Sequence, residues 1–567
     1  MSYSVPDEAA KLLREGILQN TLLRHNLPPD AAFLADHVHY DGNALPSIPV
    51  NWRFAEGIAA LKGLEATWMN ALLQKRYGLD PAEIHINTDH ASLFIMSTFF
   101  VDLVNERGEP VGAAPSPMHR IGPLFRLPAK DEAQSSLWRA SVTSIYKTKD
   151  GKYYHIHGSL DARPTLAALG LPIDQDVPNR DAATRAIQDR IAQFNAAELD
   201  SLINDEARQP GTVALGVAEY QQSEQGRANR EAGLWEISLL PNAKQKPGWW
   251  AAVSGTTPQR PLAGIKVLDL TRVIAGPTIS RELAELGASV MKVTASSHGD
   301  FSTLHADLNW GKWSTFIDLK TDEGKQALQH LIAEADVLID GFRPGALDRL
   351  GFGREAVLEL VKDRPFGIVY ARENTYGWHG PWKDRCGWQQ ISDACCGVSL
   401  EYGRAMGRDE AVTPILPNSD YSTGVIGACG VIDALIRRHD RGGSVFIDTA
   451  LNYYSQWLAA SCGTYPAPVW QDLWARHDKL TFRHWNNMPH MYPLLLQSLQ
   501  KDSRGTLLNP DFFEVRYSKA MGKHFKCLRP VLQFPGEQVQ PGYQVGTRPN
   551  GWDAPRWPKD LATEVAT

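Results

Sequence analysis

The sequence has few cysteines, no long hydrophobic run and no cluster of basic residues. Its six cysteines are spread over 567 residues without a paired C-x-x-C spacing, which argues against a disulfide scaffold and against a cysteine-based metal site. The longest uncharged hydrophobic candidate, residues 92–101, is too short to span a membrane. The N-terminus has acidic residues before any hydrophobic stretch, unlike a secretion signal. We therefore expect a cytoplasmic protein with neither a membrane partner nor a bound metal.

The charge balance is mildly acidic. With 58 lysines and arginines against 64 acidic residues, the formal net charge is -6, and nothing supplies the basic surface that binding to a phosphate backbone needs. Nucleic acid is therefore not expected as a partner. Hydrophobic residues at 43% and charged residues at 22% are typical of a globular protein, and the length predicts two or more domains.

Strand and helix patterns alternate most clearly after residue 264. We expect strands at 265–270, 289–293, 337–339 and 367–371, with helices at 275–286, 321–335 and 354–362 between them. This alternation predicts parallel β-α-β units and a sheet that is covered by helices on both faces. Ligands bind such sheets at the carboxyl ends of the strands, so the loops after Leu270, Val293, Ile339 and Ala371 are the expected site.

The first of these loops, TRVIAGP, does not contain the G-x-G-x-x-G pattern of dinucleotide-binding proteins. Neither a nicotinamide nor a flavin cofactor is therefore expected.

The first half contains a weak copy of a unit found in the second half. FAEGI at 54–58 opens an amphipathic helix that is followed by a strand at 84–88, and YSTGV at 421–425 opens one that is followed by a strand at 445–449. Two helix-strand units can also resemble each other by chance, so both interpretations stay open. If the repeat is real, Asp420 corresponds to Arg53, and the first copy has lost the acid.

Six successive motifs from residue 261 onward resemble the family III coenzyme A-transferases, also called the CaiB/BaiF family. They are PLAGIKVLDLTRVIAGP, ELGASVMKV with HGD, IDLKTDEGKQAL, ADVLIDGFRPGALDRLGFG, ENTYGWHGPW and LPNSDYSTGVIGA. The pieces DGKYYHIHG, NAAELDSLI and SEQG, between 150 and 236, resemble the smaller domain of this family. In ordinary members that domain follows the motif-rich part, whereas here it precedes it.

The resemblance implies an α/β fold, with a doubly wound, Rossmann-like parallel sheet in two unlike halves and a smaller α+β domain. Residues 1–244 would form a degenerate first unit that includes the small domain at about 112–210. A linker at 245–260, rich in proline and tryptophan, would lead to the catalytic unit at 261–470 and to an irregular C-terminal extension at 471–567. Because ordinary members are interlaced dimers, the protein would be a homodimer or a single chain that imitates that dimer.

By the same resemblance, Asp420 holds the position of the family's nucleophile. Its carboxylate would attack an acyl thioester and pass coenzyme A to a carboxylic acid through an aspartyl intermediate. The backbone amides of 422–424 would stabilise the oxyanions that form. Without the resemblance, Asp420 is an acid just before a helix, and a helix cap is its simplest role.

Further positions match places where relatives hold coenzyme A, which is the substrate rather than a resident cofactor. Arg343, Arg349 and Lys320 would pair with its phosphates, and Phe342 would pack on its adenine. The complete set is Ile274, Ala275, Asp318, Lys320, Phe342, Arg343, Arg349, Trp388, Gln389 and Gln390.

The sequence also departs from the family pattern. It reads Thr-Ala-Ser at 294–296, where relatives have an acid and then a basic or proline residue, and WGKWS at 310–314, where many have N-x-G-K-R-S. Members that act as α-methylacyl thioester racemases use a histidine near Trp388 and Gln389, and neither of these can act as a base. A racemase, isomerase or dehydratase using another base, Glu373 or Asp393, stays an alternative. So does a degenerate protein that binds without catalysis.

Overall fold

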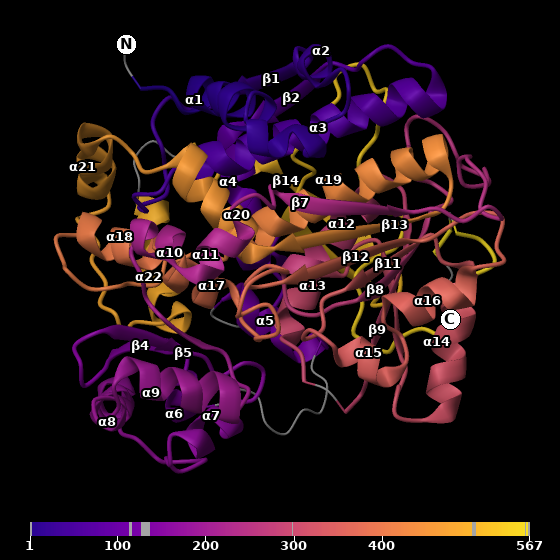
Figure 1. Ribbon diagram of the computed structural model, residues 1–567. Helices are drawn as coiled ribbons and strands as arrows, with labels where there is room; N and C mark the ends of the chain where they lie inside the picture. The colour runs from indigo at the N-terminus through magenta and orange to yellow at the C-terminus, as the bar shows by residue number, and fades with distance from the viewer. Residues whose placement is uncertain are drawn as a thin grey trace.

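The structure is a computed structural model that describes residues 3–112, 116–125, 136–297, 299–501, 506–561 and 563–564. A central sheet crosses the molecule, with the N-terminal segments on one side of it and a smaller lobe below (Figure 1). In the second half, four strands and three helices lie where the alternating pattern predicts them. They are β8 (Lys266–Leu270), β9 (Ser289–Thr294), β11 (Val337–Asp340), β12 (Val369–Asn374), α12 (Ala275–Glu285), α14 (Asp322–Glu334) and α16 (Arg354–Val361).

The central sheet has seven strands in the order β10-β9-β8-β11-β12-β13-β7. The strands β10 (Lys312–Phe316) and β13 (Ser444–Ala450) complete a parallel set of six, and β7 (Trp235–Leu240) pairs antiparallel with β13 at the edge. β7 precedes the linker at 245–260, so the boundary that we placed there divides the sheet. This correction has a physical reason, because β7 covers an edge of β13 that would otherwise present unpaired backbone groups.

Both faces of this sheet are buried. On β11, Val337 and Ile339 belong to the hydrophobic cluster that contains α12, whereas Leu338 belongs to the cluster that contains α14 and α16. Successive side chains of a strand point to opposite faces, so a sheet covered on both sides needs hydrophobic residues at consecutive positions. The run VLI at 337–339 meets this requirement.

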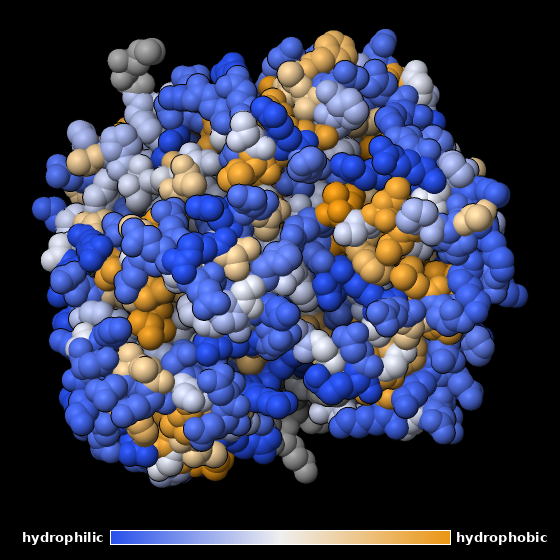
Figure 2. Space-filling view, viewed as in Figure 1, coloured by the Kyte–Doolittle hydropathy of each residue, from blue (hydrophilic) through white to orange (hydrophobic). Residues whose placement is uncertain are grey.

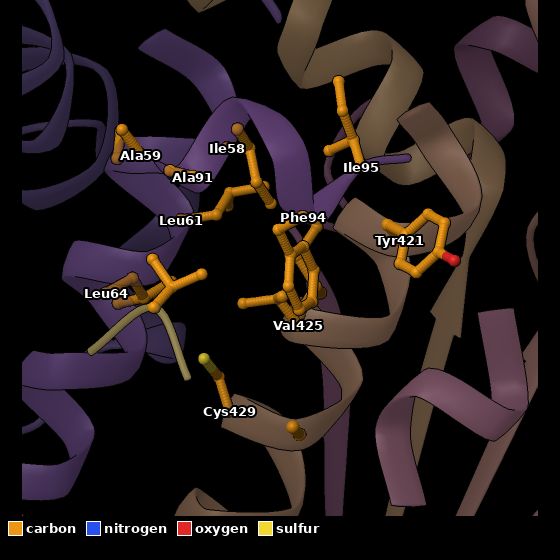
Figure 3. Packing of buried hydrophobic residues seen from close by; sticks show 14 of the residues in the cluster. Ile58, Ala59, Leu61, Leu64, Ala91, Phe94, Ile95, Tyr421, Val425 and Cys429 are labelled. Atoms are coloured by element: carbon orange, nitrogen blue, oxygen red, sulfur yellow. The ribbon is translucent and has the colours of Figure 1, made fainter. Parts of the chain in front are cut away.

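The first half contributes a parallel pair of strands, β1 (Val38–Asp41) and β2 (Ile84–Asn87), with the long helix α3 (Phe54–Tyr77) between them and α4 (Thr88–Phe94) after them. α3 packs against α19 (Asn418–Arg441), which precedes β13 and α20 (Leu451–Trp457). Figure 3 shows side chains of the two helices meeting in one core, with Ile58 and Leu61 on α3 and Val425 on α19.

The two halves of the expected repeat have the same order of elements. α3 and α19 each contain 24 residues, and each leads into a parallel strand and then a helix of 7 residues. α19 begins at Asn418 rather than at Tyr421, so aligning the helix starts places Glu56, not Arg53, opposite Asp420. The expectation that the first copy lost its acid is therefore wrong in this register.

Glu56 is closed off from solvent. Its side chain has no exposed surface, and its two carboxylate oxygens accept hydrogen bonds from Tyr3 Oη at 2.5 Å and Tyr465 Oη at 3.1 Å. The acid of the first copy is thus held in a structural contact rather than presented to a ligand.

A buried ionic cluster joins the two halves. Lys62 on α3 donates hydrogen bonds to Glu65 at 2.8 Å and to Glu282 on α12, and all three side chains are at most 2% exposed. Nearby, Arg281 pairs with Asp307 at 2.8 Å. Charges that are removed from water require such partners, so the Lys62 cluster fixes α3 against α12. The helix α3 is therefore held by α12 as well as by its packing against α19.

The smaller lobe has its own core. Three antiparallel strands, β4 (Ser144–Lys147), β5 (Tyr153–Ile156) and β6 (Gly211–Val213), lie beside helices that include α7 (Arg163–Ala168), α8 (Arg180–Ile191) and α9 (Ala196–Asp200). Their buried residues form a separate cluster between Trp138 and Ile203. Part of the range predicted for this domain, about 112–210, lies outside the described residues.

The C-terminal region is more regular than the prediction of an irregular extension at 471–567. It contains α22 (Met488–Lys501) and a hairpin of β14 (Phe513–Ser518) and β15 (Lys523–Leu528). β15 also pairs with β3 (Asp102–Val104) of the first half, and such non-local pairing leaves little trace in a local sequence pattern. Within the described ranges, no helix is both long and hydrophobic enough to cross a bilayer. Hydrophilic residues cover most of the visible face (Figure 2).

Candidate active site

A cavity of about 390 Å³ opens where several strands of the central sheet end. Its wall is formed by 272–275 after β8, 341–344 after β11 and 373–375 at the end of β12, together with 385–388, Asp420 and Leu451. The small lobe closes another side with residues that include Ser159, Asp161 and Gln209. Three of the four loops that we expected to carry the site therefore meet at this cavity, whereas the described part of the loop after β9 contributes no lining residue.

Asp420 lies in the first turn of α19 and lines this cavity. Its side chain is partly exposed, and its carboxylate forms no hydrogen bond or ion pair with the described residues. Pro417 occupies the N-cap position without a side-chain bond, so the simpler interpretation of Asp420 as a helix cap is wrong. Burial, and then the charge of Asp393, raise the pKa of Asp420 to about 8.

Two glycines of α19 allow that helix to approach α12 closely. A Cβ atom on Gly424 would lie 2.4 Å from Thr278 Cβ, and one on Gly427 would lie 2.5 Å from Ile279 Cδ1. The first contact involves the branch point of a side chain, whereas the second involves the end of a flexible one. Gly424 therefore sets the distance at which α19 presents Asp420 to the cavity.

We expect Gly424→Ala to lower stability by about 1–3 kcal/mol, because the new methyl group must displace α12. The same change should slow any reaction at Asp420, since the first turn of α19 moves with the helix. Thermal unfolding and turnover would measure the two effects. Gly427→Ala is the matched control, with a smaller effect because Ile279 can change rotamer. Equal unfolding temperatures for both variants and the parent chain would contradict this account.

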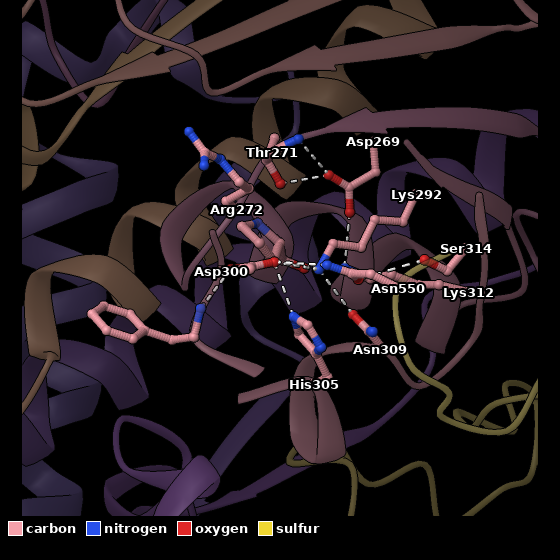
Figure 4. Close-up of polar contacts among 12 residues, drawn as sticks. Asp269, Thr271, Arg272, Lys292, Asp300, His305, Asn309, Lys312, Ser314 and Asn550 are labelled. Atoms are coloured by element: carbon pink, nitrogen blue, oxygen red, sulfur yellow. Dashed lines mark hydrogen bonds and ion pairs between the residues drawn. The ribbon is translucent and has the colours of Figure 1, made fainter. Parts of the chain in front are cut away.

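A buried polar network holds the loop that begins at Thr271 (Figure 4). Asp269 accepts hydrogen bonds from Thr271 Oγ1 at 2.5 Å, Ser280 Oγ at 2.5 Å and Lys312 Nζ at 2.9 Å. Val273 has a φ of 72°, which is strained for a β-branched residue and must be maintained by such contacts. The network thus fixes Ile274 and Ala275 at the mouth of the cavity.

The predicted coenzyme A residues divide into two groups. Ile274, Ala275, Phe342, Arg343 and Trp388 line the cavity. The remaining five do not, and they are Asp318, Lys320, Arg349, Gln389 and Gln390.

The five residues away from the wall have other environments. Gln389 donates to Asp393 within α17 (Gln389–Cys395), and Gln390 contacts His157 at 3.3 Å. The Lys320 amide donates to Asp318 at 3.0 Å in an exposed turn. Arg349 is exposed on α15 (Ala346–Leu350). A role for these residues in binding stays a prediction.

Two arginines on the wall were not predicted from the sequence. Arg272 donates to the carbonyl of Gly299 at 2.9 Å and lies over the ring of Phe342. Arg385 pairs with Asp200 of the small lobe at 2.9 Å. Arg272 stands inside the TRVIAGP motif, so that motif could have indicated it, whereas the position of Arg385 depends on how the small lobe docks.

Glu373 is a second carboxylate on the same wall. It lies on β12, is partly exposed to the cavity and forms no hydrogen bond or ion pair with the described residues. Burial is the largest cause that raises its pKa to about 8, followed by the charges of Asp420 and Asp340. The sequence suggested Glu373 only as an alternative base, because nothing in the motif ENTYGWHGPW shows that it faces Asp420.

The amides of 422–424, which we expected to stabilise oxyanions, lie inside the helix. Because α19 begins at Asn418, their N–H groups belong to the intrahelical ladder. Ser422 and Thr423 are also completely buried. This part of the predicted site is corrected by the earlier start of the helix.

The chain is similar to known proteins over its whole length. A family model described as CoA-transferase family III matches residues 262–473. A protein named acetyl-coenzyme A transferase nodX, from Hypoxylon pulicicidum, is 48% identical over 565 residues, which cover 99% of this chain and 95% of that protein. The chain belongs to the family III coenzyme A-transferases. This transferase is also 32% identical to an acyl-CoA transferase of Gibberella moniliformis, over 90% of this chain and 89% of that one.

One solved structure, a CaiB/BaiF family protein from Brucella suis, matches the transferase at 27% identity with a TM-score of 0.32, over 35% of this chain and 55% of the other. The family model and the Hypoxylon relative confirm the family resemblance inferred from the sequence. The protein is an enzyme that uses acyl-coenzyme A and transfers coenzyme A. The match to the Hypoxylon protein spans both halves of this chain.

Proposed function

We propose that the enzyme moves coenzyme A from an acyl thioester to a carboxylic acid through a covalent intermediate on Asp420. The observation that carries this proposal is the carboxylate of Asp420, which lies on the wall of a cavity of about 390 Å³ and has no partner in the part of the chain that the structure describes. A carboxylate without hydrogen-bond donors of its own is a stronger nucleophile than one that caps a helix. Acetyl-coenzyme A is the first donor to test, because the relative that is 48% identical is named an acetyl-coenzyme A transferase.

The first step forms a bond between an Asp420 oxygen and the thioester carbon and breaks the carbon–sulfur bond. It yields a mixed anhydride and the thiolate of coenzyme A. The thiolate then attacks the carbonyl carbon of Asp420, which forms an aspartyl thioester and releases the first acid as its carboxylate. The acceptor carboxylate repeats both steps in reverse order. No water enters the scheme, so a cavity that is closed by the small lobe suits it.

Coenzyme A would occupy the outer part of the cavity. Arg343 is exposed on the wall and is bonded only to the carbonyl of Arg208, at 3.0 Å, among the described residues, so its charge is available to a phosphate. Phe342 and Trp388 provide flat surfaces on the same wall. These positions support the predicted binding set in part, with Arg272 and Arg385 as additions.

We expect Arg343→Ala to raise the KM for acyl-coenzyme A roughly 10-fold with little change in kcat. The lost contact is a charge-assisted hydrogen bond that binds the substrate and the transition state alike. Steady-state kinetics with acetyl-coenzyme A would show this. Lys320→Ala is the matched control, because Lys320 is exposed and away from the cavity wall. A rise in KM for Lys320→Ala that equals the effect at Arg343 would place the phosphates elsewhere.

The proposal is tested by trapping the intermediate. The enzyme is incubated with acetyl-coenzyme A and no acceptor, and its intact mass is measured before and after treatment with hydroxylamine. We expect a coenzyme A adduct that hydroxylamine converts to a hydroxamate on the peptide that contains Asp420. A panel of small acyl thioesters that transfers coenzyme A without any such adduct would exclude the covalent route.

We also propose that the central sheet is the doubly wound, Rossmann-like sheet of the family, since its order changes direction between β8 and β11 and helices cover both faces. The contact of α3 with α19 supports the interpretation of the part of the first half before β7 as a degenerate unit that pairs with the catalytic unit within one chain. Light scattering of the purified protein would separate a monomer from a homodimer.

A further inference from the structure

Glu373 and Asp420 approach the same cavity from different elements. Glu373 extends from β12, where its neighbour Arg372 is paired with Asp448 at 2.8 Å and so belongs to the other face of the strand. Asp420 comes from α19. Both side chains are partly exposed to the cavity and have no bonding partner among the described residues. Both carboxyl groups are therefore open to a ligand that enters the cavity.

The charged groups that act most strongly on Glu373 and Asp420 are themselves acidic. From the neighbouring elements, the charge of Asp340 at the end of β11 raises the pKa of Glu373, and the charge of Asp393 on α17 raises the pKa of Asp420. No cation is among the causes that shift either carboxyl group.

The other titratable groups on the wall form no ion pair with Glu373 or Asp420 within the described ranges. The cations are Arg272, which donates to the Gly299 carbonyl, Arg343, which donates to the Arg208 carbonyl, and Arg385, which pairs with Asp200. The remaining two are Asp161, paired with Arg163, and Cys386, bonded to the Arg208 carbonyl. Two carboxyl groups that share a site and have no cation paired with them do not readily ionise together, so we expect one of them to keep its proton at neutral pH.

The proposed reaction needs one ionised carboxylate and one hydrogen-bond donor at the thioester oxygen. The amides of 422–424 are inside α19, and several other donors on the wall already have acceptors. Asn374 donates to the Gly377 carbonyl at 3.0 Å and Trp388 to Ser159 at 3.2 Å. A protonated Glu373 would be a donor with no competing acceptor.

We propose that Glu373 is a further catalytic residue of this transferase, the proton-bearing partner of Asp420 that donates a hydrogen bond to the substrate's carbonyl oxygen. This inference rests on the proposed function. As Asp420 attacks, the thioester carbonyl oxygen gains negative charge, and the O–H of Glu373 stabilises it. The proton stays on Glu373 while the carbon–sulfur bond breaks and the thiolate leaves. The same donor then serves when the thiolate attacks the anhydride.

If Glu373 has this role, the rising and the falling limb of the kcat/KM profile against pH each report one of the two residues. kcat/KM rises with pH as Asp420 ionises and falls at higher pH as Glu373 loses its proton, which gives a bell-shaped curve. Asp340 supplies an independent control. Removing its negative charge by Asp340→Asn lowers the pKa of Glu373, so the descending limb moves to lower pH.

The test compares Glu373→Gln and Glu373→Leu with the parent enzyme from about pH 5.5 to 10, using acetyl-coenzyme A and a carboxylate acceptor. Glutamine keeps a donor of similar size, so activity should stay within about 5-fold of the parent while the descending limb disappears. Leucine removes the donor, and kcat should fall by about 10²-fold or more at every pH, as for loss of one oxyanion donor. KM for the thioester should change little in both.

Three results would overturn the proposal. They are a descending limb that persists in Glu373→Gln, a Glu373→Leu enzyme with activity near that of the parent, and Glu373-dependent deuterium exchange at the acyl α-carbon, which would make Glu373 a base. Thermal unfolding confirms that each variant is folded. A different failure, in which the parent enzyme forms no adduct on Asp420, would reject the proposed function and not Glu373 alone.

Discussion

Asp420→Ala is expected to reduce coenzyme A transfer by about 10⁴-fold or more, because the variant retains the cavity but has no group that can form the covalent intermediate. The stability of the Asp420→Ala variant, in contrast to its activity, should not decrease. Burial raises the pKa of Asp420 to about 8, so the folded protein binds this proton more tightly than the unfolded chain does. The group therefore destabilises the fold progressively as pH rises from its ordinary pKa to about 8, so its removal should raise the unfolding temperature at pH 7 and slightly more at pH 9.

Turnover with acetyl-coenzyme A and thermal unfolding at pH 7 and 9 would measure both effects. Asp409→Asn is the matched control, because that carboxylate is exposed and away from the cavity wall, and it should leave transfer unchanged. If Asp420→Ala loses activity and stability together at both pH values, Asp420 has a structural role instead. If it keeps activity, the chemistry lies elsewhere in the cavity.

Lys62→Met should be among the most destabilising single substitutions in this chain. Methionine matches the volume of lysine but leaves the buried carboxylates of Glu65 and Glu282 without their cation. Removing one partner from a buried ion pair typically costs about 3–5 kcal/mol, because the remaining charge stays desolvated. The contact joins α3 to α12, so loosening it should also separate the two halves and expose the core of α3 and α19.

The pH dependence of this effect has a definite sign. In the parent protein, burial already raises the pKa of Glu65 to about 7, and loss of Lys62 raises it further. The folded variant then binds protons that the unfolded chain does not hold, so its stability improves as pH falls from 8 toward 5. The deficit relative to the parent should therefore shrink over that range.

Lys75→Met provides the comparison on the same helix. Lys75 pairs with Asp440, and both side chains are more than a third exposed, so its loss should change stability by less than about 1 kcal/mol. Thermal unfolding of the two variants at pH 5, 6.5 and 8 would decide. Similar unfolding temperatures for both would show that Lys62 is not a required partner.

Local pattern predicted the elements of the second half well. Strands β8, β9, β11 and β12 were found because consecutive hydrophobic residues between turn signals mark a sheet that is buried on both faces. The cap at Thr321 was also recognisable, and its hydroxyl does accept the Gly324 amide at 3.0 Å. These features depend on neighbours in the sequence.

Features that depend on distant contacts were missed. β7 joins the sheet from before the linker, and its register with β13 is set by packing rather than by its own residues. α19 begins three residues earlier than its hydrophobic pattern indicates, since Asn418, Ser419 and Asp420 are polar residues in the first turn of a buried helix. Because the helix starts earlier, Asp420 lies within its first turn, and the amides of 422–424 take part in the hydrogen bonds of the helix backbone.

The candidate site shows the same division. Asp420, Phe342 and Arg343 were predicted from motifs and line the cavity. Glu373 was suggested only as an alternative base, because its meeting with Asp420 requires that β12 and α19 converge at one end of the sheet. The small-lobe residues Ser159 and Asp161 could not be placed without knowing how that lobe docks.

The burial of Glu56 determines how many reaction centres one chain contains. An assembly of two identical subunits would repeat each reaction centre, but here the acid that corresponds to Asp420 is tied to Tyr3 and Tyr465. One polypeptide of 62.9 kDa should therefore carry a single coenzyme A adduct at saturation in the absence of an acceptor. The unit built around α3 then has no reaction centre of its own, and its surface can diverge as long as α3 continues to support α19.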